Sequence, residues 1–393
     1  MARGQAPAPL PGVVGKRQLN LVCALAYSPD GTLLASRSRI GTVGVWDVAT
    51  GKLLECFTDR PGGILCFVCF SPDGQYVLSG SDGTRVRRWR VAGGRQNPLP
   101  ETAVGNFGAV SADGRTFASA CYSTRQTIDL YETATGKNRA KIPAETRVES
   151  LALSPNGRWL AANDDARLRV WELPSGRERC RIDHAGGLCP VTFSADGKTM
   201  ALATSRDGLF VVDVDQLLGK SKPTRRDAPT ADELKRLWAD LIGDDAVRAY
   251  RTIHRLAEAP RASARFLGQK LKPAEGPPAP PRPLAALIRE ADGPDAERGE
   301  RAAEELRRLG GAAEPALRRA ILAARAAGKP RVELEDIYRE IEHWRPAGEE
   351  LRMLRAVEAL ELMGGADAQA VLNRLAKGGW AAHQTRETQA ALE

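Results

Sequence analysis

The first part of the chain alternates apolar and polar positions with a period of two, which is typical of β-strands. Residues 21–57 show the pattern in full, because an alternating run from Val22 to Tyr27 meets the turn Ser28-Pro29-Asp30-Gly31 and three further short runs follow. Proline and glycine supply the backbone angles of a tight reversal. The stretch therefore predicts four short antiparallel strands connected by hairpin turns.

The same turn returns four more times along the chain. Its serine recurs at Ser71, Ser111, Ser154 and Ser194, at steps of 43, 40, 43 and 40 residues counted from Ser28. The third run of each unit closes with a residue pair that is weakened in the fifth unit: Trp46-Asp47, Trp89-Arg90, Tyr131-Glu132, Trp171-Glu172 and Val212-Asp213. A fixed period near 40 residues indicates an internal repeat. One unit of four strands is therefore copied along residues 21–218.

Period, turn and closing Trp-Asp together resemble those of the WD40-repeat family, over about half of the chain. The resemblance implies a WD40-type β-propeller at residues 21–218, with one four-stranded sheet per repeat. It also implies structural roles for the closing residues, for the turn acids between the second and third strands, and for one histidine. These structural residues are Trp46, Asp47, Trp89, Tyr131, Trp171, Asp82, Asp165, Asp207 and His184.

The match to the family pattern is incomplete. The first unit has Ile40 in place of the turn acid, and only His184, ten residues before Ser194, occupies the place of the family's Gly-His pair. The Asp-His hydrogen-bond network of the family is then mostly absent. We therefore expect the sheets to depend on apolar packing.

The number of repeats leaves two arrangements of the propeller. Five units form either a small closed ring or an incomplete ring that a partner or a second copy completes. The fifth unit shows no clear fourth strand after Val214, and residues 12–20 of the N-terminal tail 1–20 have room for one strand. In closed propellers of this family an N-terminal strand commonly completes the last sheet. We expect closure by residues 12–20 or, failing that, association through open strand edges.

Beyond a polar linker at residues 219–230 the apolar period changes from two to 3.6, which predicts helices. Thr230 and Glu233 form a capping box at the start of a helical segment, residues 231–272. A Pro-rich linker follows at residues 273–283, and no helix can cross it. Further helices are expected over residues 295–309, 313–327, 332–344, 346–363 and 366–377.

Residues 284–393 contain a second internal repeat. Gly310-Gly311 and Gly364-Gly365 are 54 residues apart, and Leu306 matches Leu360 around them. Paired amphipathic helices broken at glycine resemble HEAT-type helical repeats, including the short bacterial kind. The fold expected from the whole sequence is therefore multidomain β + α, with a WD40-type β-propeller followed by an α-helical HEAT-like domain.

The composition fits a protein of two or three soluble domains. The chain has 393 residues, and its sharp change of period predicts two independently folding halves, 1–220 and 231–393. No apolar run approaches the roughly 20 residues that cross a bilayer. The opening residues MARGQAPAPLPG lack the long apolar core of a secretory signal, so we expect a cytoplasmic protein.

The seven cysteines all lie before residue 190. Their odd number, in a reducing compartment, predicts no disulfide framework. Cys66 and Cys69 form a CxxC, but residues three apart in a strand point to opposite faces and cannot hold one ion together. Cys23, Cys66 and Cys189 each stand five residues before the turn serine. We expect them to be small buried core residues rather than a thiol site.

The sequence contains no phosphate loop, HExxH motif, nucleophile elbow or paired Cys/His ligand set. We therefore expect a non-catalytic protein without cofactor or metal. His254, flanked by Ile253 and Leu256, is expected to be a satisfied residue of a helix face. Asp164-Asp165 is expected in a turn that connects two strands. Asp244-Asp245 is expected at the start of a helix, where acids interact favourably with the helix dipole.

Both repeat architectures present broad surfaces, which favours a protein–protein interaction scaffold without membrane contact. The net charge of +8 leaves nucleic-acid or acidic-ligand binding through basic propeller loops as the alternative. Acid-rich stretches at residues 297–305 and 333–342 argue against nucleic-acid binding by the helical half. A hydrolase or lyase carried by the propeller has only fold analogy in its favour.

Each expected loop between a second and a third strand carries an arginine. These are Arg39, Arg85, Arg125, Arg167 and Arg206. In the family that the chain resembles, such loops lie together around the central channel. A ring of arginines there would focus positive potential on one mouth and hold acidic or phosphorylated segments of partner proteins. The other interpretation is that these are solvated turn residues in an arginine-rich chain.

Overall fold

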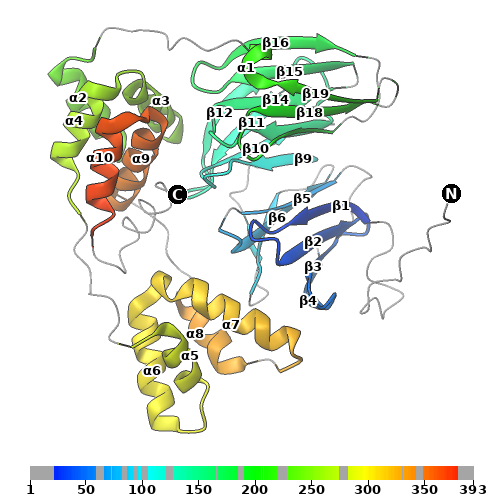
Figure 1. Ribbon diagram of the computed structural model, residues 1–393, viewed down its shortest axis with the longest axis vertical. Coiled ribbons are helices and arrows are strands. Elements are labelled where there is room, and N and C mark those ends of the chain that lie inside the picture. Colours follow the sequence, from blue (N-terminus) through cyan, green and yellow to red (C-terminus); the bar gives the residue numbers. More distant parts are fainter. Residues whose placement is uncertain are drawn as a thin grey trace.

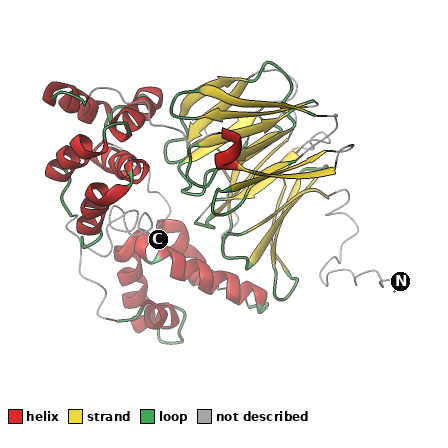
Figure 2. Cartoon of the chain, turned by 45° about the horizontal axis from the view of Figure 1, so that its top comes forward, coloured by secondary structure: helices red, strands yellow, loops and turns green. Residues whose placement is uncertain are grey.

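A computed structural model describes most of the chain. The described residues are 22–58, 66–71, 73–81, 86–92, 96–98, 105–120, 127–164, 166–184, 190–204, 206, 208–218, 228–273, 282–329, 331–341 and 348–378. Among them, five antiparallel sheets come first in the chain and are followed by helices (Figure 1). The β part and the helical part lie side by side, as Figure 2 shows. The β + α fold class expected from the sequence is confirmed.

Each of the first four sheets is a meander of consecutive strands. The first has β1 (Val22–Tyr27), β2 (Leu33–Ser38), β3 (Thr42–Asp47) and β4 (Leu53–Thr58); the second has β5 (Cys66–Phe70), β6 (Tyr76–Ser81), β7 (Arg87–Arg90) and β8 (Gln96–Pro98). The third has β9 (Phe107–Val110), β10 (Thr116–Ala120), β11 (Thr127–Glu132) and β12 (Asn138–Pro143); the fourth has β13 (Ser150–Leu153), β14 (Trp159–Asn163), β15 (Arg167–Glu172) and β16 (Arg177–Asp183). The fifth has β17 (Val191–Phe193), β18 (Thr199–Thr204) and β19 (Gly208–Asp213).

The predicted turns form between the first two strands of each sheet. In the first sheet Gly31 adopts φ 69°, which glycine reaches without the steric strain of a Cβ. The Ser28 hydroxyl donates to Asp30 Oδ1 at 2.6 Å and accepts from the Leu33 backbone N–H at 2.8 Å. The same serine contacts recur in the other four sheets. These local contacts set the hairpins independently of the rest of the chain.

The closing aromatic residues are buried between neighbouring sheets. Trp46, Trp89, Tyr131 and Trp171 are 5%, 4%, 2% and 3% exposed. The indole of Trp89 stacks on Phe57 of the first sheet, with ring centroids 5.0 Å apart. Its Nε1 also donates to the Ser79 hydroxyl at 2.8 Å. The apolar packing between sheets that the sequence predicts is therefore present.

The five sheets do not close into a ring among the described residues. Inner strands contact in the order β1, β5, β9, β13 and β17. The described part of the fifth sheet has three strands. Large apolar side chains are exposed on both terminal sheets, at Leu25 and Tyr27 on β1 and at Leu209 and Val211 on β19. The described sheets are thus an incomplete propeller, and the closing strand expected at residues 12–20 lies outside the described residues.

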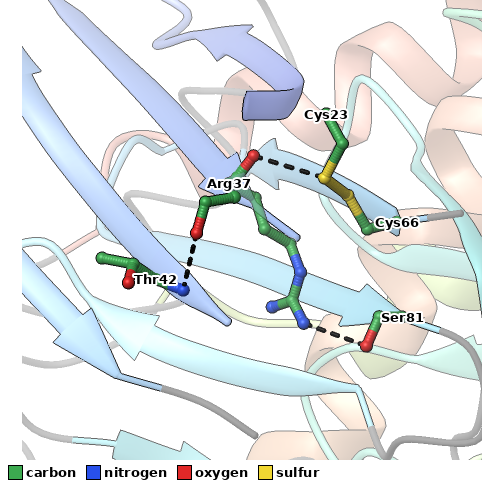
Figure 3. Close-up of a disulfide and its surroundings, with 6 residues drawn as sticks. Cys23, Arg37, Thr42, Cys66 and Ser81 are labelled. Atoms are coloured by element: carbon green, nitrogen blue, oxygen red, sulfur yellow. Dashed lines mark hydrogen bonds between the residues drawn. A yellow bond between two sulfur atoms is a disulfide. The ribbon is translucent and has the colours of Figure 1, made fainter. Parts of the chain in front are cut away.

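A disulfide joins the first two sheets, which overturns the expectation that none would form. Cys23 on β1 and Cys66 on β5 are bonded, with their Cα atoms 6.5 Å apart (Figure 3). The physical reason is the repeat itself, because equivalent positions on neighbouring inner strands lie side by side. Arg37, buried in the same place, donates from Nη2 to the Ser81 hydroxyl at 3.1 Å and also links the two sheets. Cys189 lies outside the described residues.

The helices follow the fifth sheet. They are α1 (Val214–Leu218), α2 (Ala231–Asp240), α3 (Ala246–Ala257), α4 (Pro260–Lys270), α5 (Leu284–Ala291), α6 (Ala296–Leu309), α7 (Glu314–Ala326), α8 (Val332–Glu340), α9 (Gly348–Met363) and α10 (Gly365–Leu375). The expected capping box is present, because the Thr230 hydroxyl accepts from the Glu233 N–H at 3.2 Å. Helices α1 and α5 are absent from the sequence predictions. No described helix is long and apolar enough to cross a membrane.

The helices pack around two separate apolar cores. The first helical unit consists of α2, α3, α4, α9 and α10, and the second consists of α5, α6, α7 and α8. The expected grouping placed residues 284–393 together and 231–272 apart, whereas α9 and α10 return to pack on α2–α4. The matched glycines Gly310 and Gly364 do share a positive φ, 54° and 58°, at the ends of α6 and α9.

Candidate protein-interaction site

The structure places three of the five expected loop arginines. Arg39 is half-buried in the β2–β3 turn, Arg167 is the first residue of β15, and Arg206 is exposed in the turn before β19. Because the strands are antiparallel, these loops lie at the same end of their respective sheets. Arg85 and Arg125 lie outside the described residues. The arginine ring therefore stays a prediction.

One of these arginines is already held by its own sheet. Arg167 Nε lies 3.1 Å from Asp183 Oδ1 on β16, and the two side chains are 40% and 82% exposed. An exposed pair of this kind contributes roughly 0–1 kcal/mol to folding. Its main effect here is to compensate positive charge at the loop end of the fourth sheet.

The expected structural polar residues are placed in part. Asp47 Oδ1 accepts from the Thr50 N–H at 2.7 Å and from the Thr50 hydroxyl at 2.5 Å, so it fixes the β3–β4 turn. His184 Nε2 is hydrogen-bonded to Asn163 Oδ1 at 2.7 Å, at the end of β14. Asp82, Asp165 and Asp207 lie outside the described residues. Among the described residues, His184 therefore contacts the side-chain amide of Asn163 and not a turn aspartate.

Sequence reasoning missed a buried charged contact between the third sheet and the first helical unit. Arg355 on α9 is 1% exposed and binds both oxygens of Glu132 at 2.9 Å. Its Nη1 also donates to the backbone oxygens of Leu241 and Gly243, each at 2.7 Å. Burial alone would raise the pKa of Glu132, but the Arg355 hydrogen bonds and the nearby arginine charges hold it below its usual value.

A second buried arginine, Arg139 on β12, completes this contact. Its Nη2 donates to Glu358 on α9 at 2.6 Å and its Nη1 donates to the Thr116 hydroxyl at 2.8 Å. The guanidinium also lies over the Tyr250 ring of α3, 5.0 Å from the centroid. At the rim, Arg115 forms a bidentate pair with Glu361. Removing one member of such a buried pair leaves the other charge uncompensated.

The second helical unit is held by the first and second sheets. Arg90 at the end of β7 lies over the Tyr338 ring of α8, 3.4 Å from the centroid, and donates to the Tyr338 backbone oxygen at 3.2 Å. Arg325 pairs with Glu55 on β4, and Lys52 Nζ donates to the Ala326 backbone oxygen at 2.6 Å. One of these contacts is indicated by the sequence. The second unit closes with Trp89-Arg90 where the first closes with Trp46-Asp47, so an arginine stands in the place of the acid.

These contacts share one end of the sheets. In each of these sheets the residues that contact the helices lie in the turn between the first and second strands, in the turn between the third and fourth strands, or in the strand residues beside these turns. The arginine loops instead connect the second strand of a sheet to the third. In an antiparallel meander those two sets of turns lie at opposite ends of a sheet. The helices therefore occupy one end of the first three sheets and leave the loop end to other contacts.

His254 and the carboxylate pair Asp244-Asp245 were candidates for catalytic residues, and in the structure their contacts are those of core and helix-capping residues. His254 is 6% exposed and sits edge-on to Tyr250, and burial lowers its pKa to about 3. Its Nε2 is buried without a hydrogen-bond partner, which differs from the satisfied side chain that the sequence predicts. Asp245 caps α3 by accepting from the Arg248 N–H at 3.0 Å. Within the described ranges no three His, Cys, Asp or Glu side chains gather as metal ligands.

A family model described as WD domain, G-beta repeat matches three segments of the chain: residues 15–47, 51–90 and 136–172. The second segment begins directly before β4 and ends with β7, and the third begins directly before β12 and ends with β15. Each of these two matches thus joins the last strand of one sheet to the first three strands of the next. The β half of the chain carries WD40 repeats.

Proposed function

We propose that the protein is a non-catalytic protein–protein interaction scaffold, with the loop end of its propeller as the main partner surface. WD40 repeats generally mediate contacts between proteins, and this supports the proposal. The observation that carries it is the one-sided position of the helices, which are held at the opposite end of the sheets by Glu132, Arg139 and Arg90. The helices thus occupy one end of the first three sheets, and the proposal assigns the opposite, loop end to partners.

The partner chemistry that we propose for the loop end is acidic or phosphorylated. Arg39, Arg167 and Arg206 supply guanidinium groups, which bind carboxylates and phosphates through two parallel hydrogen bonds. Asp183 compensates one of them, so the proposal depends on the loops acting together. Arg85 and Arg125 belong to the same set by sequence.

The test is charge reversal of all five loop arginines to glutamate. The matched control reverses five exposed helix arginines, Arg261, Arg265, Arg289, Arg308 and Arg319, and so changes the net charge equally. Capture of a phosphorylated peptide library should be lost in the loop variant, kept in the control, and weakened steeply by salt in the native protein. Equal capture by both variants would place the binding surface elsewhere.

The alternative of nucleic-acid binding rests on the net charge of +8 alone. Retention on duplex DNA and its salt dependence separate the two functions, because phosphate contacts release counterions and give a steep salt slope. Retention by the native protein that the loop variant loses and the control variant keeps would favour the alternative.

For the helical half we propose HEAT-like repeats, supported by the positive φ shared by Gly310 and Gly364. For location, we retain the cytoplasm as a proposal. The Cys23–Cys66 disulfide counts against it, since reducing compartments keep such thiols reduced. Alkylation of freshly lysed cells followed by intact mass measurement reports the state of these two cysteines directly.

A further inference from the structure

A buried arginine lies beneath the connector that joins the third sheet to the fourth. The connector covers residues 144–149, between the end of β12 and the start of β13. Pro143 of β12 pairs with Thr127, the first residue of β11, so the connector lies at the loop end of the sheets. Arg169 on β15 is 2% exposed and lies on the same side of its strand as the loop arginine Arg167. The loop end therefore has a further arginine, which is buried.

The guanidinium of Arg169 is only partly used by the protein. Its Nη2 lies 3.0 Å from Glu145 Oε2 and 3.5 Å from the Thr146 hydroxyl. Its Nε and Nη1 are buried and have no hydrogen-bond partner. A buried N–H without a partner is costly, so this group has unused capacity to bind an acceptor. A guanidinium binds a carboxylate or a phosphate best through two parallel hydrogen bonds, and the Glu145 contact supplies at most one of them.

Glu145 makes this contact from an unusual backbone conformation. Its φ is 58°, and in the described part of the chain it is the one residue other than glycine with a positive φ. That region costs free energy for a residue with a Cβ, so it persists only where the surrounding structure holds the residue in place. The Glu145 side chain is 58% exposed, so solvent reaches the ion pair from its side. Glu145 is thus an exposed carboxylate over a buried guanidinium.

Other acids stand near Arg169, so a bound anion has to replace one of them rather than join them. Arg181, directly opposite Arg169 on β16, is held by Glu178 through two hydrogen bonds of 2.7 and 3.1 Å and lies 3.5 Å from Glu145. Asp164 is buried and accepts a hydrogen bond from the connector. Glu145 is the exposed acid that contacts Arg169. Exchange of its carboxylate for another anion leaves the local charge nearly unchanged.

We propose that Arg169 binds a single acidic group of a partner protein, a carboxylate or a phosphate monoester, which takes the place of Glu145. Glu145 then acts as an internal ligand that covers the site when no partner is bound. One partner oxygen pairs with Nη2 and a second with Nη1 or Nε, which adds the hydrogen bond that Glu145 does not supply. The proposal rests on the loop-end function proposed above and deepens it, because it names one anchoring residue and the contact that regulates access to it.

The test compares the full chain with its Glu145→Gln variant by fluorescence anisotropy. The probe is a labelled Gly/Ser peptide with one central phosphoserine, and matched peptides carry glutamate or serine there. Loss of the internal carboxylate should raise the affinity for the phosphoserine peptide about tenfold, as expected if Glu145 covers Arg169 about nine-tenths of the time. A larger gain for the phosphoserine peptide identifies a phosphate as the partner group, and a larger gain for the glutamate peptide identifies a carboxylate. Equal binding of the serine peptide would overturn the proposal.

Glu178→Gln is the matched control. It removes the same charge from the same group of residues and leaves Glu145 over Arg169. The affinity of this variant for the phosphoserine peptide should change less than about twofold, because solvent and salt screen a partly exposed charge. An equal gain in both variants would mean that the gain is a general effect of removing negative charge, and would overturn the proposal.

Substitution of the arginine itself completes the test. Arg169→Lys in the Glu145→Gln background should abolish the gain, because an ammonium group keeps the charge but lacks the planar pair of donors. If this variant does not fold, hydrogen exchange on the Glu145→Gln protein locates the peptide instead. Protection over residues 144–149 on addition of the phosphoserine peptide supports the proposal. Unchanged exchange there, with protection elsewhere, would overturn it.

Two outcomes separate this inference from the proposed loop function. The Arg39→Glu/Arg206→Glu variant leaves the fourth sheet intact. If it binds as the native protein does while Glu145→Gln keeps its gain, Arg169 is the site and the arginine ring is wrong. If the fivefold loop variant loses capture while Glu145→Gln changes nothing, the ring stands and this inference fails.

Discussion

The third and fourth sheets each carry an arginine at an equivalent bulge of the outer strand, in different surroundings. Arg139 of the third sheet is covered by α3 and α9 and bonded to Glu358, whereas Arg179 of the fourth sheet is 35% exposed and lies 3.9 Å from Glu172. The backbone around the two residues is the same. The contribution of a charge to folding therefore depends on what covers it, and substitution of the two arginines tests that difference.

The aromatic closing residues should not distinguish the two sheets. Tyr131 and Trp171 are buried alike, so Tyr131→Ala and Trp171→Ala should each cost ~3–5 kcal/mol of unfolding free energy in urea. Trp159 lies outside this register but is also buried, at 6% exposed in the core between the fourth and fifth sheets, so Trp159→Ala should cost a similar amount. A thermal melt that Tyr131→Ala or Trp171→Ala leaves unchanged would show that these side chains are not buried between the sheets.

Substitution of the two arginines should lower the unfolding free energy by very different amounts. Arg139→Ala removes one partner of a buried ion pair and leaves Glu358 uncompensated, which typically costs ~3–5 kcal/mol. Arg179→Ala removes a partly exposed charge and should cost less than ~1 kcal/mol. Urea unfolding of both variants measures the difference. Equal losses would mean that α9 does not remain docked on the third sheet in solution.

The described part of the fifth sheet has three strands, whereas the other four sheets have four each. The matched segments at Gly51 and Gly136 begin directly before fourth strands, and the first match begins at Gly15, so we propose that the chain before β1 supplies the fourth strand of the fifth sheet. Deleting residues 1–19 should then destabilise the fifth sheet, because the open edge of β19 would lose the strand that we propose pairs with it. Unchanged melting and unchanged monomer state would rule out this strand.

Acid should loosen the first helical unit before the second. The Arg355 hydrogen bonds hold the pKa of Glu132 below 4.5, so the stability from this group is present above 4.5 and is lost as pH falls through the lowered value. Burial raises the pKa of Glu314 in the second unit, so falling pH relieves a buried charge there. Hydrogen exchange from pH 7 to pH 3 should show α9 opening first, and Glu132→Gln should remove this pH dependence. Simultaneous opening of α8 and α9 would contradict the assignment.

Most of the fold is predictable because its signals are local. The Ser28 turn depends on contacts within six residues, and the Thr230 cap on contacts within four, so both are readable in the sequence. Helix α5 is missed because its apolar run, Leu284–Ala291, is short and follows a Pro-rich segment. The independence of the two halves stays a prediction, although the buried pair of Arg355 and Glu132 joins them.

The contacts between distant parts were not predictable from single residues. An arginine such as Arg139 reads as a solvated surface residue until the helix that covers it is known. Cys23 and Cys66 occupy equivalent repeat positions, which is a signal for a contact between neighbouring sheets, but their chemistry alone favoured free thiols in a reducing compartment. The loop arginines were predicted from position, and the described structure places three of them at one end of their sheets.

The disulfide has a consequence for how a row of stacked sheets comes apart. Such a row behaves as a one-dimensional array that frays from its ends, since an end unit has one neighbour. Cys23 and Cys66 lie 43 residues apart and enclose the first sheet in a covalent loop, which restricts the unfolded chain by about 4 kcal/mol in the chain-entropy view. One end of the row is thereby fastened, and unravelling begins from the fifth sheet.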